Sequence, residues 1–93
     1  MKATAEIQAI PIGAGVSVRK EVQRVVALLE SAGLVVEPHA SGTDVEGDLD
    51  QILRAVEAIH ATLHAEGTVR LVTFVKLETR TDKIPTIAGK RLS

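Results

Sequence analysis

The chain contains no cysteine, asparagine, tryptophan or tyrosine, and Phe74 is its only aromatic residue. Without cysteine it can form neither a disulfide nor a thiolate metal site, and it has no cysteine nucleophile. A single aromatic side chain is too few for the base-stacking surface of RNA-binding sheets. The core must therefore be built from valine, leucine, isoleucine and alanine.

Strong charge of either sign is also missing. The net charge is -1 over 93 residues, and both signs are mixed along the chain. This balance argues against partners that need a basic surface, so we expect neither nucleic-acid nor membrane binding. No run approaches the roughly 18 apolar residues of a membrane span, and the N-terminus lacks the apolar stretch of a signal peptide. We expect one domain, residues 1–93, in the cytoplasm.

Hydrophobic periodicity predicts four strands and two helices. The first helix follows Ser17 as N-cap and stops at Gly33, and the second follows Asp48, which forms a capping box with Gln51, and stops at Gly67. Leu53 belongs to the apolar stripe expected for the second helix. Alternating or β-branched segments predict four strands, over residues 3–10, 34–37, 43–46 and 69–78. Pro11 and Pro38 are expected to end the first two.

This order is βαββαβ, which predicts an α+β, ferredoxin-like sandwich with two helices on one face of a four-stranded antiparallel sheet. The missing cysteine and asparagine exclude metallochaperones and acyl-phosphate hydrolases of this fold. Ile10, Val72 and Phe74 should share the second face. We expect another copy to bury them in a homo-oligomer, a dimer or dimer of dimers. Residues 79–93 indicate a loop or partner-contacting tail.

Residues 41–50 combine small, hydroxyl and acidic side chains between two hydrophobic patterns. Strand alternation puts Thr43 and Val45 on one face and Asp44 and Glu46 on the other. One face of the sheet must therefore carry two carboxylates, which makes this stretch the candidate site.

Three segments of the chain, residues 10–18, 42–50 and 67–83, resemble the thiamine-binding, formerly uncharacterised protein family to which YkoF is related. The Gly-Thr-x-x-Glu-Gly motif that begins at Gly42 is the most specific of them. The resemblance implies a ferredoxin-like protomer, assembly into dimers and tetramers through open sheet faces, and binding of thiamine or its hydroxymethylpyrimidine moiety. It implies no known reaction and no cofactor.

Thiamine chemistry suggests a role for each candidate residue. A carboxylate can bind the aminopyrimidine edge and another can accompany the thiazolium cation, roles that suit Glu46 and Asp44. Ser41 and Thr43 can hydrogen-bond the edge of the ligand, and Phe74 can lie against its ring.

A purely structural interpretation of the same residues stays open. Glu46 can pair with Lys76 or Arg70 across the sheet, or cap a neighbouring amide, while Asp44 is solvated.

Two weaker patterns remain. The loop with Gly13 and Gly15 before Ser17 could cradle an anion, which makes Ser17 a further ligand-binding candidate, although a flexible turn is the favoured interpretation. His60 and His64 have the i, i+4 spacing of a metal pair, and His39 could be a third ligand. A packed, hydrogen-bonded His60 is favoured, so no metal site is predicted.

The sequence contains no nucleophile motif and no histidine placed to form a catalytic triad, so we expect that the protein is not an enzyme. The sequence therefore favours a non-catalytic protein that binds thiamine or its pyrimidine moiety at or near a subunit interface. The alternatives are a metabolite-sensing regulatory module of the same topology and an oligomeric scaffold without a small ligand.

Overall fold

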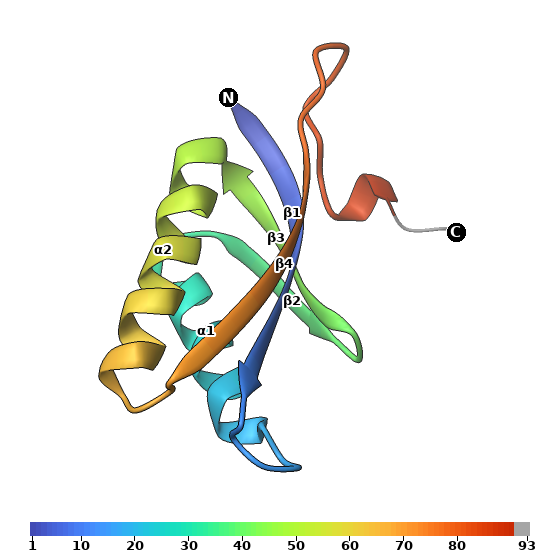
Figure 1. Ribbon diagram of the computed structural model, residues 1–93. Helices are drawn as coiled ribbons and strands as arrows, with labels where there is room; N and C mark the ends of the chain where they lie inside the picture. The colour runs from blue at the N-terminus through green and yellow to red at the C-terminus, as the bar shows by residue number, and fades with distance from the viewer. Residues whose placement is uncertain (91–93) are drawn as a thin grey trace.

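The computed structural model describes residues 1–90, in which two helices cover one face of a four-stranded antiparallel sheet (Figure 1). The strand order is β2-β3-β1-β4, which confirms the α+β, ferredoxin-like prediction. The elements along the chain are β1 (Lys2–Ile12), α1 (Arg19–Ser31), β2 (Val35–His39), β3 (Gly42–Asp48), α2 (Leu49–Ala65), β4 (Arg70–Glu78) and a final 3-10 turn (Ala88–Lys90).

The central strand β1 pairs with β3 on one side and with β4 on the other. Its alternate residues Ala3, Ala5 and Ile7 are buried against the helices, where they form one core with side chains from α1, α2 and β3. The residues between them point to the opposite face, which we call the open face. The sheet therefore has one apolar side that packs against the helices and an open face on which Thr4, Glu6 and Gln8 of β1 lie.

Helix α2 begins as the sequence predicts. The side-chain Oε1 of Gln51 accepts a hydrogen bond from the backbone N of Asp48 at 3.1 Å, which satisfies an amide at the helix start. Gly67 follows the helix with φ +109°, a conformation that favours glycine. The prediction for Leu53 was wrong, because it is exposed while its neighbour Ile52 is buried. One step along a helix turns the side chain by about 100°, which moves Leu53 off the core-facing stripe.

Helix α1 ends as expected, with Gly33 at φ +81°, but its start differs from the prediction. It begins at Arg19 with Val18 as N-cap and no side-chain cap. Ser17 therefore does not cap it, because this residue lies one position too early in the chain.

Two strands continue through prolines that were expected to end them. Pro38 lies inside β2, which is an edge strand, and Pro11 lies inside β1. The pairing of β1 with β3 stops at Ile7, so β1 has a neighbour on only one side at Pro11. A residue without an N–H is tolerated where one side of the strand has no partner.

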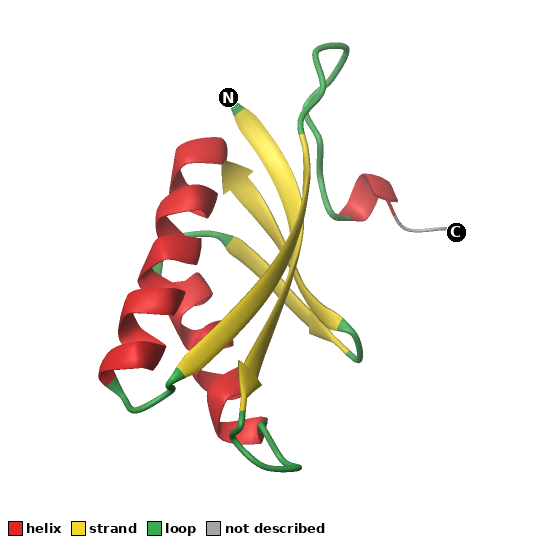
Figure 2. Cartoon of the chain, viewed as in Figure 1, coloured by secondary structure: helices red, strands yellow, loops and turns green. Residues whose placement is uncertain are grey.

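The segment that follows β4 turns back over the open face, opposite the helices (Figure 2). We call residues 79–90 the tail. Its Ile87 is buried although it belongs to no strand or long helix. Residues 91–93 of the predicted tail lie outside the described residues. Among residues 1–90, no helix is both long and apolar enough to span a bilayer.

Two leucines of α2 test this arrangement. Leu63 is 2% exposed and Leu53 is 52% exposed. Leu63→Ala should lower the free energy of unfolding by about 2–5 kcal/mol, because it leaves a cavity in the core. Leu53→Ala should change it by less than about 1 kcal/mol. Urea unfolding measures both, and equal losses would contradict the assignment of the core face.

Candidate functional site

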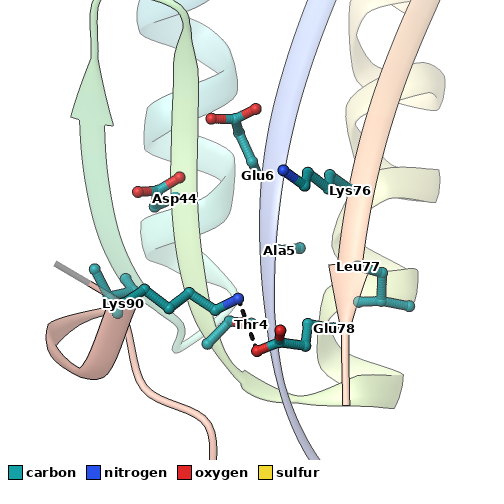
Figure 3. Close-up of a pocket in the computed structure, with 9 residues that line it drawn as sticks. Thr4, Ala5, Glu6, Asp44, Lys76, Leu77, Glu78 and Lys90 are labelled. Carbon is teal, nitrogen blue, oxygen red and sulfur yellow. Dashed lines mark ion pairs between the residues drawn. The ribbon is translucent and has the colours of Figure 1, made fainter. Parts of the chain in front are cut away.

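A pocket of about 350 Å³ lies on the open face between β1, β3, β4 and the tail (Figure 3). We call it the open-face pocket. Its volume falls within the range of roughly 300–1,000 Å³ typical of small-molecule sites. The residues that line it are Thr4, Ala5, Glu6, Asp44, Lys76, Leu77, Glu78, Ile87 and Lys90.

Strand register brings the charged side chains of this pocket together. Glu6 on β1 lies directly opposite Asp44 on β3 and opposite Lys76 on β4. In the next row on the same face, Thr4 on β1 lies opposite Glu46 on β3 and opposite Glu78 on β4. On β1, β3 and β4, these two adjacent rows thus present four carboxylates to the open face.

The tail forms one wall of the pocket through two polar contacts. The backbone N of Ile87 donates a hydrogen bond to Glu46 Oε1 at 2.7 Å, and Lys90 Nζ lies 2.7 Å from Glu78 Oε1. The dashed line in Figure 3 marks the second contact. Both anchors are charge-assisted, and such contacts are stronger than hydrogen bonds between neutral groups.

The contact with Lys90 lowers the pKa of Glu78 below its usual value through a hydrogen bond, and the positive charges of Lys90 and Arg80 act in the same direction. Because the pKa is lowered in the folded state, the stabilisation is present at neutral pH. It is lost only as the pH falls through that lowered pKa. The tail therefore keeps this anchor throughout the neutral range.

Thr4 carries an unsatisfied polar group beside these charges. The residue is 3% exposed, and its hydroxyl oxygen has no hydrogen-bond partner among residues 1–90. A buried hydroxyl without a partner costs about 1–3 kcal/mol. A polar ligand group in the pocket beside Thr4 can supply the missing partner.

His39 reaches the same face from β2. Its Nε2 lies 3.1 Å from Asp44 Oδ1 and 3.4 Å from Glu6 Oε2, an arrangement that offers three metal-ligating groups. However, the backbone N of Ser41 donates a hydrogen bond to His39 Nδ1 at 3.3 Å. In a neutral ring this bond leaves the hydrogen on Nε2, pointing to the carboxylates. A metal ion bound at Nε2 would need the lone pair of that nitrogen, which this hydrogen occupies.

The other two histidines are hydrogen-bonded separately. His60 Nε2 lies 2.9 Å from Thr73 Oγ1, which confirms the favoured interpretation of His60 as a packed, hydrogen-bonded residue. His64 Nδ1 lies 2.7 Å from the carbonyl oxygen of Thr68. The helical spacing of the two histidines thus serves contacts within the fold.

Three of the six predicted site residues lie on the open face. Asp44 lines the open-face pocket, and Glu46 holds the tail wall through Ile87. Phe74 is on the same face opposite Gln8, outside the lining residues, and is 59% exposed. Within residues 1–90, Glu46 forms no ion pair with Lys76 or Arg70, whereas its alternative role as the cap of a neighbouring amide is formed with Ile87.

Two other predicted residues lie on the opposite side of the sheet. Thr43 is buried on the helix-covered face, and it lines a second pocket of about 260 Å³ together with Ser41. This helix-face pocket lies between β1, α1 and the β2–β3 turn. Ser17 lies in the loop before α1 and lines neither pocket. The six predicted residues therefore do not form one site.

Sequence reasoning missed most of the open-face pocket. The alternation of β1 and β4 already indicated which side chains share a face, so Thr4, Glu6 and Glu78 had a usable signal. Ile87 and Lys90 had none, because the tail shows no periodicity that predicts where it packs.

The sheet, its two helices on one face and a charged pocket on the other define a small ferredoxin-like protein with a candidate small-molecule site. Residues 5–93 match the family described as thiamine-binding protein, and the chain belongs to this family.

Relatives of this chain include two UPF0045 proteins. The UPF0045 protein MJ1052 of Methanocaldococcus jannaschii is 40% identical over 89 residues, covering 96% of this chain and 88% of that protein. The UPF0045 protein sll0230 of Synechocystis is 38% identical over 90 residues, covering 97% of this chain and 74% of that protein.

Solved structures agree with the fold. A crystal structure of MJ1052 superposes with a TM-score of 0.89 and covers 96% of this chain and 91% of that chain. A candidate thiamine biosynthesis or salvage protein of Thermotoga maritima, TM0486, has a TM-score of 0.85 at 24% identity, covering 97% and 95% of the two chains. At that identity the likeness concerns the fold alone.

The contact between Glu46 and Ile87 can be tested directly. Glu46→Ala should speed hydrogen exchange of the Ile87 amide by about tenfold or more, because a hydrogen bond to a charged group is lost. NMR-detected exchange measures this rate. Glu57→Ala, which removes an exposed carboxylate from α2, should leave it unchanged. Equal exchange in wild type and Glu46→Ala would contradict the anchored tail.

Proposed function

We propose that this protein binds thiamine or its hydroxymethylpyrimidine moiety in the open-face pocket, without catalysing a reaction. The observation that carries the proposal is membership of the thiamine-binding protein family over residues 5–93. The charged pocket on the open face supports it, because its lining supplies hydrogen-bonding groups of both kinds.

The carboxylates suit a cationic ligand. Glu6 and Asp44 face each other across β1 and β3, and Glu78 adds a third acidic group to the lining. The thiazolium of thiamine is a permanent cation, which such a group of carboxylates attracts. Its aminopyrimidine presents a ring nitrogen beside an amino group, and an acidic side chain can bind that edge.

We assign the predicted residues accordingly. Asp44 contacts the ligand directly, while Glu46 adds negative charge and keeps the tail wall in place. Phe74, next to the pocket on β4, can lie against a ring that extends beyond it. Ser41, Thr43 and Ser17 lie elsewhere, so a role for them requires a second ligand position near the helix-face pocket.

The ligand is held rather than converted in this proposal. Among residues 1–90, the lining of the open-face pocket contains no cysteine, serine or histidine, and its one hydroxyl, that of Thr4, has no histidine beside it in the lining to act as a base. Storage, delivery or sensing of the bound vitamin are the roles that remain, and a cytoplasmic location stays a prediction. A second copy covering the rest of the open face would place the site at or near a subunit interface.

Two other functions remain as outcomes of the test. A metabolite-sensing module is favoured by the helix-face pocket, where apolar residues of α1 and β1 surround Thr43. An oligomeric scaffold would bind neither ligand.

Calorimetric titration with thiamine, and separately with hydroxymethylpyrimidine, tests the proposal. Wild-type protein should bind at least one of them saturably. Asp44→Asn should weaken the binding about tenfold or more, because it removes a charge-assisted contact with little change of shape.

Thr43→Val is the matched control, since it removes a hydroxyl from the other pocket and should leave the affinity unchanged. Loss of binding in Thr43→Val alone would move the site to the helix-face pocket. No heat with either ligand, in protein shown by circular dichroism to be folded, would contradict the proposed function.

A further inference from the structure

His39 contacts two carboxylates that line the open-face pocket, although it does not line that pocket itself. Its Nε2 lies 3.1 Å from Asp44 Oδ1 and 3.4 Å from Glu6 Oε2. Figure 3 shows the two acids on neighbouring strands at the pocket. The proposed function uses both carboxylates and assigns nothing to His39.

Strand register explains how a residue of β2 reaches a residue of β1. His39 pairs with Gly42 of β3, which has no side chain to block the way across the sheet. A Cβ atom at position 42 would lie 3.0 Å from the carbonyl oxygen of Ile7 and 3.5 Å from Glu6 Cγ. The glycine that begins the Gly-Thr-x-x-Glu-Gly motif therefore leaves room for His39 and Glu6 to meet.

One row of charged residues crosses the four strands beside His39. It consists of three acids and one base, in the order Glu37, Asp44, Glu6 and Lys76. His39 is two residues from Glu37 along β2, so it lies on the same face as the row. The cation that the tail adds to the pocket, Lys90, is held by Glu78. The surroundings of His39 are therefore mainly acidic.

Thr4 is a separate observation that points to a ligand in the same pocket. It is 3% exposed and lines the pocket with Glu6 and Asp44, and its hydroxyl has no hydrogen-bond partner among residues 1–90. Exposed charged residues often remain solvated, whereas a buried hydroxyl needs a partner. The unsatisfied hydroxyl therefore favours a polar ligand beside these carboxylates.

We propose that His39 is a positioning residue for the cationic part of the ligand, and that its charge makes binding in the open-face pocket depend on pH. This role rests on the proposed function, because it concerns the same pocket. Carboxylates on directly opposite residues, such as Glu6 and Asp44, repel each other. The neutral ring turns its Nε2–H towards both and holds them side by side, and each carboxylate has a second oxygen for a cation.

The protonated ring acts against a cationic ligand. Both of its nitrogens carry hydrogen, so Nδ1 can no longer accept the hydrogen bond from the backbone N of Ser41. The positive charge of the ring then lies beside Glu6 and Asp44 and competes with a bound cation for their negative charge. Histidine side chains change charge between about pH 5 and 8, where most carboxyl groups stay ionised. Binding of a cation should therefore weaken as the pH falls through this range.

Calorimetric titration with thiamine at about pH 8 and about pH 5.5 tests this role, since histidine changes charge between the two. The affinity of the wild type should fall about threefold to tenfold at the lower pH, because the charged ring repels the thiazolium. His39→Gln keeps an N–H donor on an uncharged side chain and should lose most of this pH dependence. His64→Gln, the matched control on α2, should keep it.

His39→Leu tests the positioning at about pH 8, where the ring is uncharged. It removes the N–H and should weaken binding about threefold or more, and His39→Gln should recover most of that loss. Circular dichroism should show every variant folded. Equal affinity of the leucine and glutamine variants would overturn the positioning role.

The Ser41 amide gives a readout that needs no ligand. Its NMR signal should move between about pH 5 and 8, because the protonated ring of His39 cannot accept its hydrogen bond. An unchanged signal would overturn the pH dependence. Thiamine binding equally tight at both pH values, or a pH dependence that persists in His39→Gln, would overturn it while leaving the proposed function intact. No binding at either pH would contradict the proposed function, and the role of His39 with it.

Discussion

The pairing of β1 on both sides is the constraint on which this structure depends. Because β1 is central, its alternation determines both faces of the sheet: Ala3, Ala5 and Ile7 build the core with the helices, and Thr4 and Glu6 line the open-face pocket. A shift of one residue in its pairing would exchange the two sets. Core and candidate site are therefore two consequences of one register.

The pocket needs the tail as well as the sheet. A bare sheet face is flat, and it becomes a pocket here because Ile87 and Lys90 are attached above it by Glu46 and Glu78. Both anchors come from the open face, so acidic residues of the proposed binding site also hold one wall of the pocket.

Local patterns predicted most of the fold and only part of the site. The strand alternation, the Asp48–Gln51 capping box and the glycine helix stops depend on neighbours within a few residues, and the sequence displays those directly. The anchor of Ile87 on Glu46 spans 41 residues, and nothing in either segment indicates it. The predicted cluster failed to converge because alternation sends Thr43 and Asp44 to opposite faces, so neighbours in sequence serve different pockets.

A crystal structure with thiamine bound tests the central claim most directly. The account predicts the aminopyrimidine and thiazolium rings between β1, β4 and the tail, with a carboxylate of Glu6 or Asp44 in contact with the ligand and the Thr4 hydroxyl partnered. Ligand seated between α1 and the β2–β3 turn, with the open face unchanged, would contradict it.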